Sequence, residues 1–102
     1  MTTSSNMISV IVPVFNEEKT ILKVLLKLNE LKKSGFSSEI IVVDDGSTDN
    51  TKNILKENSK LIDKLFYNDT NRGKGFSVKR GIENADGNYV IFQDADLEYD
   101  PN

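Results

Sequence analysis

The segment Asp94-Ala95-Asp96 places two carboxylates two residues apart near the end of the chain. In an extended segment, residues with this spacing point to the same side, so both carboxylates face one cation. Two carboxylates this close repel each other, and a cation between them relieves the repulsion. Glu98 follows with the same spacing and is a third candidate ligand. An Asp-x-Asp triplet also arises by chance in acidic loops, so its place in the fold decides between the two interpretations.

A second acid pair, Asp44-Asp45, is followed by Gly46 and Ser47. One of these carboxylates would accept an N–H from a nucleobase edge, and a wrong base would then leave a buried polar group unpaired. The alternative is structural: Asp45-Gly46 forms a turn and Ser47 or Thr48 caps a helix. Both interpretations can hold together, because Asp44 and Asp45 point to opposite sides of a strand.

Two further segments carry candidate groups. Phe15 would pack near a ribose or base and Glu17 would accept a hydroxyl, although a proline turn and a helix start at Glu17 explain the same residues. The basic, glycine-flanked segment 71–75 contains Lys74 and leads into a predicted helix, which suits an anion. An ordinary mobile surface loop is the competing interpretation of that segment.

Composition excludes several kinds of chemistry. The 102 residues include no cysteine and no histidine, which removes thiolate and imidazole metal sites and every Ser-His or Cys-His mechanism. A bound metal must therefore have oxygen ligands, which favours Mg²⁺ or Mn²⁺. Sixteen acidic and thirteen basic residues give a formal net charge of -3, which argues against nucleic acid as a partner. With no apolar signal or membrane-length segment, we expect a cytoplasmic protein.

Hydrophobic patterning predicts strands alternating with helices. Buried strands are predicted at 8–14, 40–43 and 89–92, a weaker strand at 61–67, and helices at 17–33, from Ser47 or Thr48 to about 58, and at 76–84. Pro13 lacks an N–H, so strand pairing is expected to stop there. Leu31 is placed on the inward face of the first helix, and Val78 and Ile82 on that of the third.

This alternation predicts an α/β fold with an open, mainly parallel four-stranded sheet flanked by helices. Residues 1–7 form a polar tail and residues 8–102 one domain. Ligands of such sheets bind beyond the carboxyl ends of the strands. Three predicted strands run into polar or acidic residues at that edge: Asn16-Glu17, Asp44-Asp45 and Asp94-Asp96.

The chain resembles family 2 glycosyltransferases with the GT-A fold. Four stretches carry the resemblance, in the family's order and spacing: residues 9–18 around Pro13, residues 41–49 around Asp44-Asp45, residues 71–75, and residues 93–101 around Asp94-Ala95-Asp96. The last stretch is most similar to the dolichyl- and polyprenyl-phosphate sugar transferases. The resemblance implies that Pro13, Phe15 and Glu17 line a nucleoside pocket, and that Asp45, with Asp44, reads the base.

The same resemblance implies a site for the metal and the diphosphate. Lys74 would lie near the diphosphate, Asp94 would face the ribose and the metal, and Asp96 would be the principal metal ligand. Glu98 stands where the polyprenyl-phosphate subgroup has a third metal-contacting residue. The implied reaction is inverting transfer of a sugar from a UDP- or GDP-type donor, dependent on Mg²⁺ or Mn²⁺, to a polyprenyl phosphate or another acceptor, at the cytoplasmic face of a membrane.

The length departs from the family, because a GT-A domain is about twice as long as this chain. We therefore expect the donor-binding half alone, with the catalytic base downstream and no efficient transfer. We also expect self-association through the open edge of the fourth strand. Two alternatives remain: a non-catalytic nucleotide- or metal-binding module, and a receiver-type phosphoacceptor domain. The second carries its acid pair after the first strand, whereas here the pair follows the second.

Overall fold

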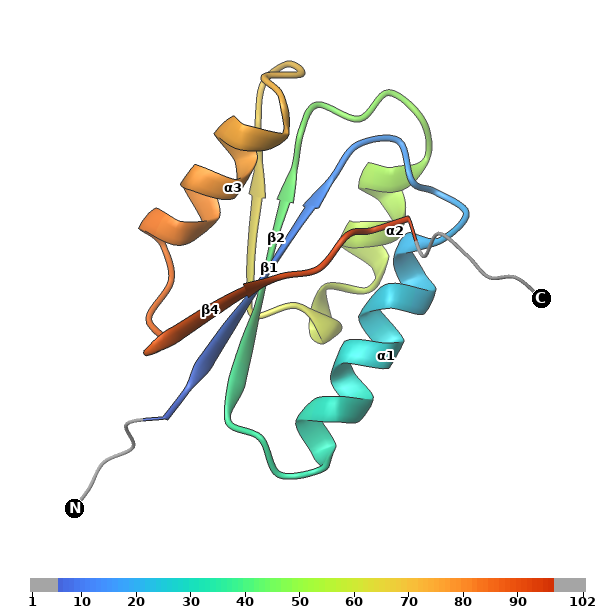
Figure 1. The fold of residues 1–102 in the computed structure, drawn as a ribbon. Coiled ribbons are helices and arrows are strands. Elements are labelled where there is room, and N and C mark those ends of the chain that lie inside the picture. The colour runs from blue at the N-terminus through green and yellow to red at the C-terminus, as the bar shows by residue number, and fades with distance from the viewer. Residues whose placement is uncertain (1–5, 97–102) are drawn as a thin grey trace.

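The computed structural model of the chain describes residues 6–96. Four parallel strands form one sheet in the order β3-β2-β1-β4 (Figure 1). The strands are β1 (Ile8–Val14), β2 (Ser38–Asp44), β3 (Lys64–Tyr67) and β4 (Tyr89–Phe92). Helices α1 (Ile21–Lys33) and α2 (Thr51–Glu57) cover one face, and α3 (Lys74–Glu83) covers the other. The predicted α/β fold is confirmed.

The core lies on both faces of the two central strands, as their continuous apolar runs predict. One face of β1 and β2 packs with α1 and α2 through side chains that alternate along the strands: Val10, Val12, Val14, Ile40 and Val42. The other face packs toward α3 through Ile11, Ile41 and Val43. Because both central strands are buried on both faces, they hold the loops at their carboxyl ends rigidly.

The prediction that pairing stops at Pro13 is wrong. The register of β1 with β2 continues through Pro13 and Val14, and Val14 O accepts a hydrogen bond from Asp45 N at 2.8 Å. Backbone groups of successive strand residues point to opposite sides, so the missing N–H of Pro13 faces the β4 side. There β4 has already ended at Phe92, so no ladder bond is lost.

Helix α1 begins at Ile21, four residues later than predicted. Residues 18–20 form a turn, and Glu17 O accepts hydrogen bonds from the N–H groups of Thr20 and Ile21. Leu31 was predicted to face inward, but 58% of it is exposed. Leu31 lies in the last turn of the helix and lines an open cavity with Leu28 and Gln93, so no element covers it among the described residues.

Helix α2 begins at Thr51 with Asn50 at the N-cap, so neither Ser47 nor Thr48 caps it. Strand β3 is shorter than predicted, because the 3-10 helix η1 (Ser59–Leu61) occupies the start of that segment. Both changes leave the carboxyl ends of β2 and β3 where the sequence places them.

The inward face of α3 differs from the prediction. Ile82 is exposed and Val78 is half-buried, whereas Ser77 and Gly81 are fully or nearly buried. A Cβ on Gly81 would lie 2.7 Å from Ile11 Cγ2. The helix therefore approaches the sheet through its small residues, because larger ones would not fit.

Strand β4 forms one edge of the sheet, and all four of its residues are exposed. Its sequence, Tyr-Val-Ile-Phe, is entirely apolar or aromatic and carries no charge. None of the helices in residues 6–96 has the length and apolar character needed to cross a membrane.

Candidate functional site

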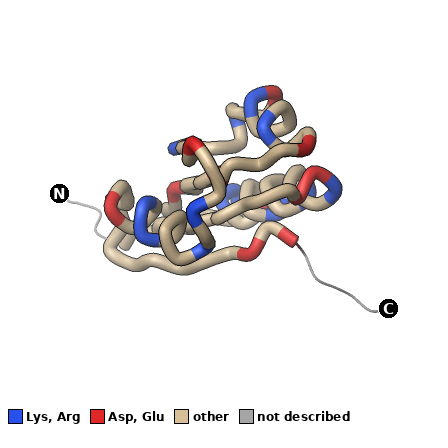
Figure 2. The backbone as a smooth tube through the Cα atoms, turned by 90° about the horizontal axis from the view of Figure 1, so that it is seen from above, with Lys and Arg blue, Asp and Glu red and all other residues tan. Residues whose placement is uncertain are grey.

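The carboxyl ends of the strands gather the candidate site residues at one end of the molecule. Figure 2 views the chain from that end, where acidic and basic positions lie close together in the loops. The loop after β1 supplies Phe15 and Glu17, the loop after β2 supplies Asp45, and the segment after β4 supplies Asp94 and Asp96. This is the end at which the sequence predicts ligand binding.

Four predicted residues form one charged cluster. Lys74 Nζ pairs with Asp94 Oδ1 at 2.7 Å, and both side chains are well exposed. The pKa of Lys74 is raised, first by its hydrogen bond with Asp94 and also by the charge of Asp96. The pKa of Glu17 is raised, first by burial and then by the charge of Asp96. Asp96 therefore lies within electrostatic reach of both Glu17 and Lys74, and Lys74 links it to Asp94.

This cluster fits a hard divalent cation that is shared with a ligand. Within residues 6–96 no group of three or more acidic side chains could hold a metal ion alone, and Glu98 lies outside the described residues. Mg²⁺ is usually bound by one or two carboxylates together with ligand phosphates. Burial is the main cause of the raised pKa of Glu17, and the negative charges of Asp96 and Asp49 add to it; a cation would offset that part.

A cavity of about 260 Å³ lies beside the cluster. Its lining comes from the end of β1, from the loops that follow β1, β2 and β3, and from the first turns of α3: Pro13, Val14, Phe15, Asp45, Asn71, Gly73, Lys74 and Ser77. Phe15 is 40% exposed and offers an aromatic face to this space. Four residues predicted to bind the nucleotide (Pro13, Phe15, Asp45 and Lys74) are thus brought together in one pocket.

Asp45 holds one wall of the pocket in place. Its Oδ1 accepts hydrogen bonds from Arg72 N at 2.7 Å and Asn68 Nδ2 at 2.8 Å, and its Oδ2 accepts from Gly73 N at 2.9 Å. A carboxylate has about four acceptor positions. Asp45 therefore keeps capacity for one further donor, such as an N–H of a ligand, after fixing the loop.

Asp44 is not brought to the pocket. It is fully buried, and its Oδ2 accepts a hydrogen bond from Ser47 N at 3.1 Å. Its Oδ1 has no partner among the described residues. The pKa of the neighbouring Tyr67 is raised by burial and then by the charge of Asp44. As the strand alternation predicts, Asp44 and Asp45 point to opposite faces, and only Asp45 lines the cavity.

Asn68 and Ser77 support the site and were not singled out from the sequence. Asn68 Nδ2 donates to Asp45 Oδ1 and to Ser77 Oγ, both at 2.8 Å, while its Oδ1 accepts from Arg80 Nη1 at 2.9 Å. The spacing of Ser77 and Gly81, small residues four apart on one helix, is the signal that could have identified this face.

Gly46 allows the two loops at the pocket wall to meet. Its φ is +75°, and a Cβ at this position would lie 2.6 Å from Asn71 N. Both the backbone conformation and the close approach require glycine.

Asn16 joins the loops that follow β1 and β2. Its Oδ1 accepts hydrogen bonds from Thr48 N at 2.7 Å and Asp49 N at 3.2 Å, and its own N–H donates to Ser47 Oγ at 2.8 Å. The backbone of Asn16 is in the left-handed region, with φ of 51°. These bonds fix the backbone that carries Phe15 and Glu17 on either side.

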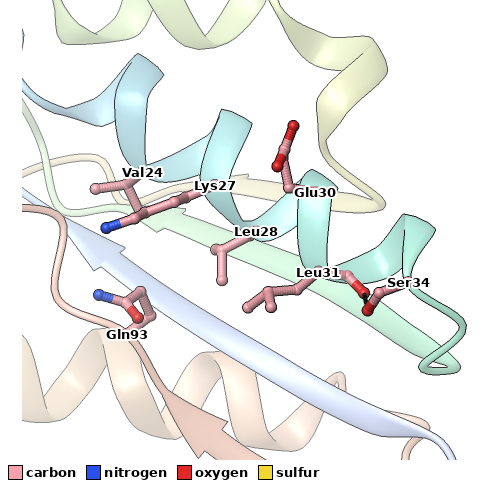
Figure 3. A pocket seen from close by; sticks show the side chains of 7 residues that line it. All are labelled: Val24, Lys27, Leu28, Glu30, Leu31, Ser34 and Gln93. Atoms are coloured by element: carbon pink, nitrogen blue, oxygen red, sulfur yellow. Dashed lines mark hydrogen bonds between the residues drawn. The ribbon is translucent and has the colours of Figure 1, made fainter.

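The largest cavity described, about 570 Å³, lies elsewhere, between α1 and the end of β4. Figure 3 shows Leu28 and Leu31 extending from α1 into the space above Gln93, whereas Glu30 points away. This larger cavity is lined by none of the predicted site residues. We therefore assign the functional site to the smaller cavity, where charged groups converge.

Comparison with known proteins gives a consistent family. The family model described as Glycosyl transferase family 2 matches residues 9–102. The dolichyl-phosphate beta-glucosyltransferase of Saccharomyces cerevisiae is 41% identical over 98 residues, covering 87% of this chain and 29% of the yeast protein. The undecaprenyl-phosphate 4-deoxy-4-formamido-L-arabinose transferase of Proteus mirabilis is 35% identical over 100 residues, covering 94% of this chain and 31% of the other.

Solved structures agree with this relationship. The structure of S. aureus TarS 1-349 in complex with UDP-GlcNAc has a TM-score of 0.74 at 37% identity, covering 88% of this chain and 26% of that one. The mannosyltransferase PcManGT from Pyrobaculum calidifontis, in complex with GDP-Man and Mn²⁺, has a TM-score of 0.76 at 29% identity, covering 92% and 28%. The neighbours are GT-A glycosyltransferases. The chain spans between 29% and 41% of the length of the curated relatives it matches.

Proposed function

Because the chain belongs to glycosyl transferase family 2, we propose that it binds a nucleoside-diphosphate sugar, as the donor site of an enzyme that transfers the sugar to an acceptor. The observation that carries this proposal is the cluster of Glu17, Lys74, Asp94 and Asp96 beside the 260 Å³ pocket. Acids and a lysine at the mouth of a small pocket suit a ligand with one uncharged end and one diphosphate end.

Asp94 and Asp96 are proposed to hold Mg²⁺ or Mn²⁺ together with the diphosphate, with Glu98 as a third ligand. The bound cation would offset the charge that develops on the departing nucleoside diphosphate. Lys74 pairs with Asp94, so its ammonium would lie within reach of the same diphosphate. With a cation held at Asp94, the ammonium of Lys74 would be available to contact the diphosphate.

The nucleoside is proposed to occupy the cavity between Phe15 and Asp45. Phe15 supplies an apolar surface for the ribose or the base, and Asp45 has one acceptor position left for a base N–H. Solved neighbours were studied with UDP, UDP-GlcNAc and GDP-Man, so uracil and guanine are the bases to test.

The acceptor is proposed to be a polyprenyl phosphate at the cytoplasmic face of a membrane, with inversion at the anomeric carbon. Two curated relatives are named for dolichyl and undecaprenyl phosphate. A phosphate acceptor is already an anion at neutral pH, so it attacks without a catalytic base. Because the chain spans about a third of these relatives, we expect the 102 residues alone to transfer sugar inefficiently.

Calorimetric titration of the chain with UDP and GDP, with and without Mn²⁺, tests the proposal. We expect Mn²⁺-dependent binding of one nucleotide, and loss of that dependence in Asp96→Ala, because Asp96 is the principal metal ligand. Glu57→Ala, an exposed carboxylate on α2, is the matched control. Binding that ignores both Mn²⁺ and the Asp96→Ala substitution would contradict the proposed site.

We also propose that the chain self-associates through the edge of β4. An apolar edge strand with unpaired backbone groups is a template for pairing with a second copy, and β4 has no charged residue to oppose it. Light scattering should show mass increasing with concentration, and Ile91→Lys should restore the monomer. A monodisperse monomer of the unmodified chain at high concentration would contradict this.

A further inference from the structure

Thr20 occupies the N-cap position of α1 but does not use its hydroxyl to cap the helix. A threonine at this position usually accepts a hydrogen bond from an N–H of the first turn. Among residues 6–96, the Thr20 side chain makes no such bond. Its Oγ1 instead donates to the carbonyl oxygen of Ala95 at 2.6 Å, across 75 residues of sequence, and has a longer contact of 3.5 Å with Glu17 Oε1. Figure 1 shows the segment after β4 ending beside the first turn of α1.

Ala95 is the residue between the two candidate metal ligands. The pairing of β4 with β1 ends just before it, with the hydrogen bond from Gln93 N to Ile11 O at 2.9 Å. Beyond that bond, the side chain of Ala95 is 5% exposed and packs in the core shared with α1. The Thr20 hydroxyl therefore holds the backbone of this segment at the point where the sheet no longer does.

The orientation of both carboxylates depends on that backbone. Asp94 and Asp96 flank Ala95 directly, so fixing the carbonyl and the side chain of Ala95 restrains the backbone from which both carboxylates project. The same turn holds Glu17, since Glu17 O accepts the N–H of Thr20. The start of α1 thus determines the distance between the acidic loop after β1 and the acidic segment after β4.

We propose that Thr20 is a positioning residue for the cation site, which it serves by fixing the backbone between Asp94 and Asp96. The inference rests on the proposed function for the identity of the metal ligands. The bond itself comes from the geometry of the chain, and it can be tested with no metal present.

Two variants separate the hydroxyl from the rest of the side chain. Thr20→Val keeps the shape and removes the hydroxyl, while Thr20→Ser keeps the hydroxyl and removes a methyl group. With Mn²⁺ and the nucleotide that the unmodified chain prefers, we expect Thr20→Val to weaken metal-dependent binding by roughly tenfold, the lower end for partners that orient metal ligands. Thr20→Ser should stay close to the unmodified chain. Nucleotide binding without metal should be the same in all three proteins, which a general structural defect would not leave unchanged.

A second measurement needs no metal. Backbone amide NMR of the metal-free proteins should show altered shifts and increased mobility at Asp94 to Asp96 in Thr20→Val, and little change in Thr20→Ser. Equal order in this segment in all three proteins overturns the positioning role, and so does equal weakening of binding by both variants. If the unmodified chain shows no Mn²⁺-dependent binding, the proposed function fails, while the amide measurement still decides the role of Thr20.

Discussion

A glutamate lies at each end of the parallel sheet: Glu39, which is buried, at the amino end and Glu17, which is half-buried, at the carboxyl end. Their surroundings shift the two pKa values in opposite directions. At the amino end, Glu39 accepts hydrogen bonds from Ser9 Oγ and Asp86 N at 2.6 Å each and pairs with Lys64 at 3.1 Å. Burial raises the pKa of Glu39, but these hydrogen bonds and the lysine outweigh it and lower the pKa overall. At the carboxyl end, burial and the charge of Asp96 raise the pKa of Glu17.

The opposite pKa shifts distinguish a carboxylate that stabilises the fold from one that is suited to binding a cation. A carboxylate whose hydrogen bonds and countercharge come from the chain itself stabilises the fold, because its ionised form is favoured in the folded state. A carboxylate left beside other carboxylates stores unfavourable charge that a bound cation would relieve. A carboxylate with a raised pKa and too little countercharge, such as Glu17, therefore indicates a ligand site, whereas the more deeply buried Glu39, which has its countercharge, does not.

Removing Glu39 should have the largest effect on stability. Glu39→Ala leaves Lys64, Ser9 Oγ and the N–H of Asp86 without their shared acceptor, and breaking a largely buried pair in this way costs about 3 kcal/mol. Urea unfolding measures the loss, with the exposed Glu57→Ala as control. Mn²⁺-dependent nucleotide binding by the folded fraction should be unchanged. A loss no larger than in the control would mean that the amino-end network contributes little.

Substitution of Lys64 at the amino end and of Lys74 at the carboxyl end should affect stability and ligand binding differently. Lys64 donates to both Glu39 and Asp86, and its side chain is 29% exposed, so Lys64→Met should destabilise the chain by about 1–2 kcal/mol. The Lys74–Asp94 pair is about two-thirds exposed on both sides, so Lys74→Met should leave the unfolding transition unchanged. Lys74→Met should weaken diphosphate binding, and Lys64→Met should not. The opposite assignment of the two effects would reverse the comparison.

The pH dependence of stability should also differ in sign between the ends. The folded pKa of Glu39 lies below its ordinary value of 4.5, so its contribution is complete above that value and is lost as the pH falls through the folded pKa. The folded pKa of Glu17 lies above 4.5, so stability falls as the pH rises from 4.5 through the folded pKa. The free energy of unfolding, measured with urea at several pH values, should depend less on pH below 4.5 in Glu39→Gln. In Glu17→Gln it should depend less on pH above 4.5. Identical curves for the two variants would contradict the sign difference.

The elements with continuous apolar runs could be predicted closely from the sequence. The bounds of β1 and β4 agree with the prediction, because a short β-branched or aromatic run between polar residues favours a buried strand. The inward face of α3 could not be predicted from periodicity. Val78 and Ile82 have the right spacing, but the 2.7 Å approach of Gly81 to Ile11 selects the small face, and that distance is set by tertiary packing.

The candidate site likewise contains residues that could be predicted from the sequence and supporting residues that could not. The rule that ligands bind at the carboxyl ends of strands brings Glu17, Asp45, Lys74, Asp94 and Asp96 together without knowledge of their contacts. The supports of these residues come from elsewhere in the sequence: Asn68 lies 23 residues from Asp45, and Thr20 lies 75 residues from Ala95. A single polar side chain carries no periodic signal, so its partner appears only once the chain is folded.

The smallest predicted effect is also the sharpest test of the comparison. Asp96→Asn removes the charge that adds to burial in raising the pKa of Glu17, and it also removes an attraction to Lys74, so the metal-free chain should unfold at nearly the same temperature. The same substitution removes a proposed metal ligand and should abolish Mn²⁺-dependent binding. Calorimetric unfolding and nucleotide titration on one preparation measure both. Destabilisation by Asp96→Asn would mean that Asp96 serves the fold as Glu39 does, and the carboxyl end would then hold no stored charge for a cation to relieve.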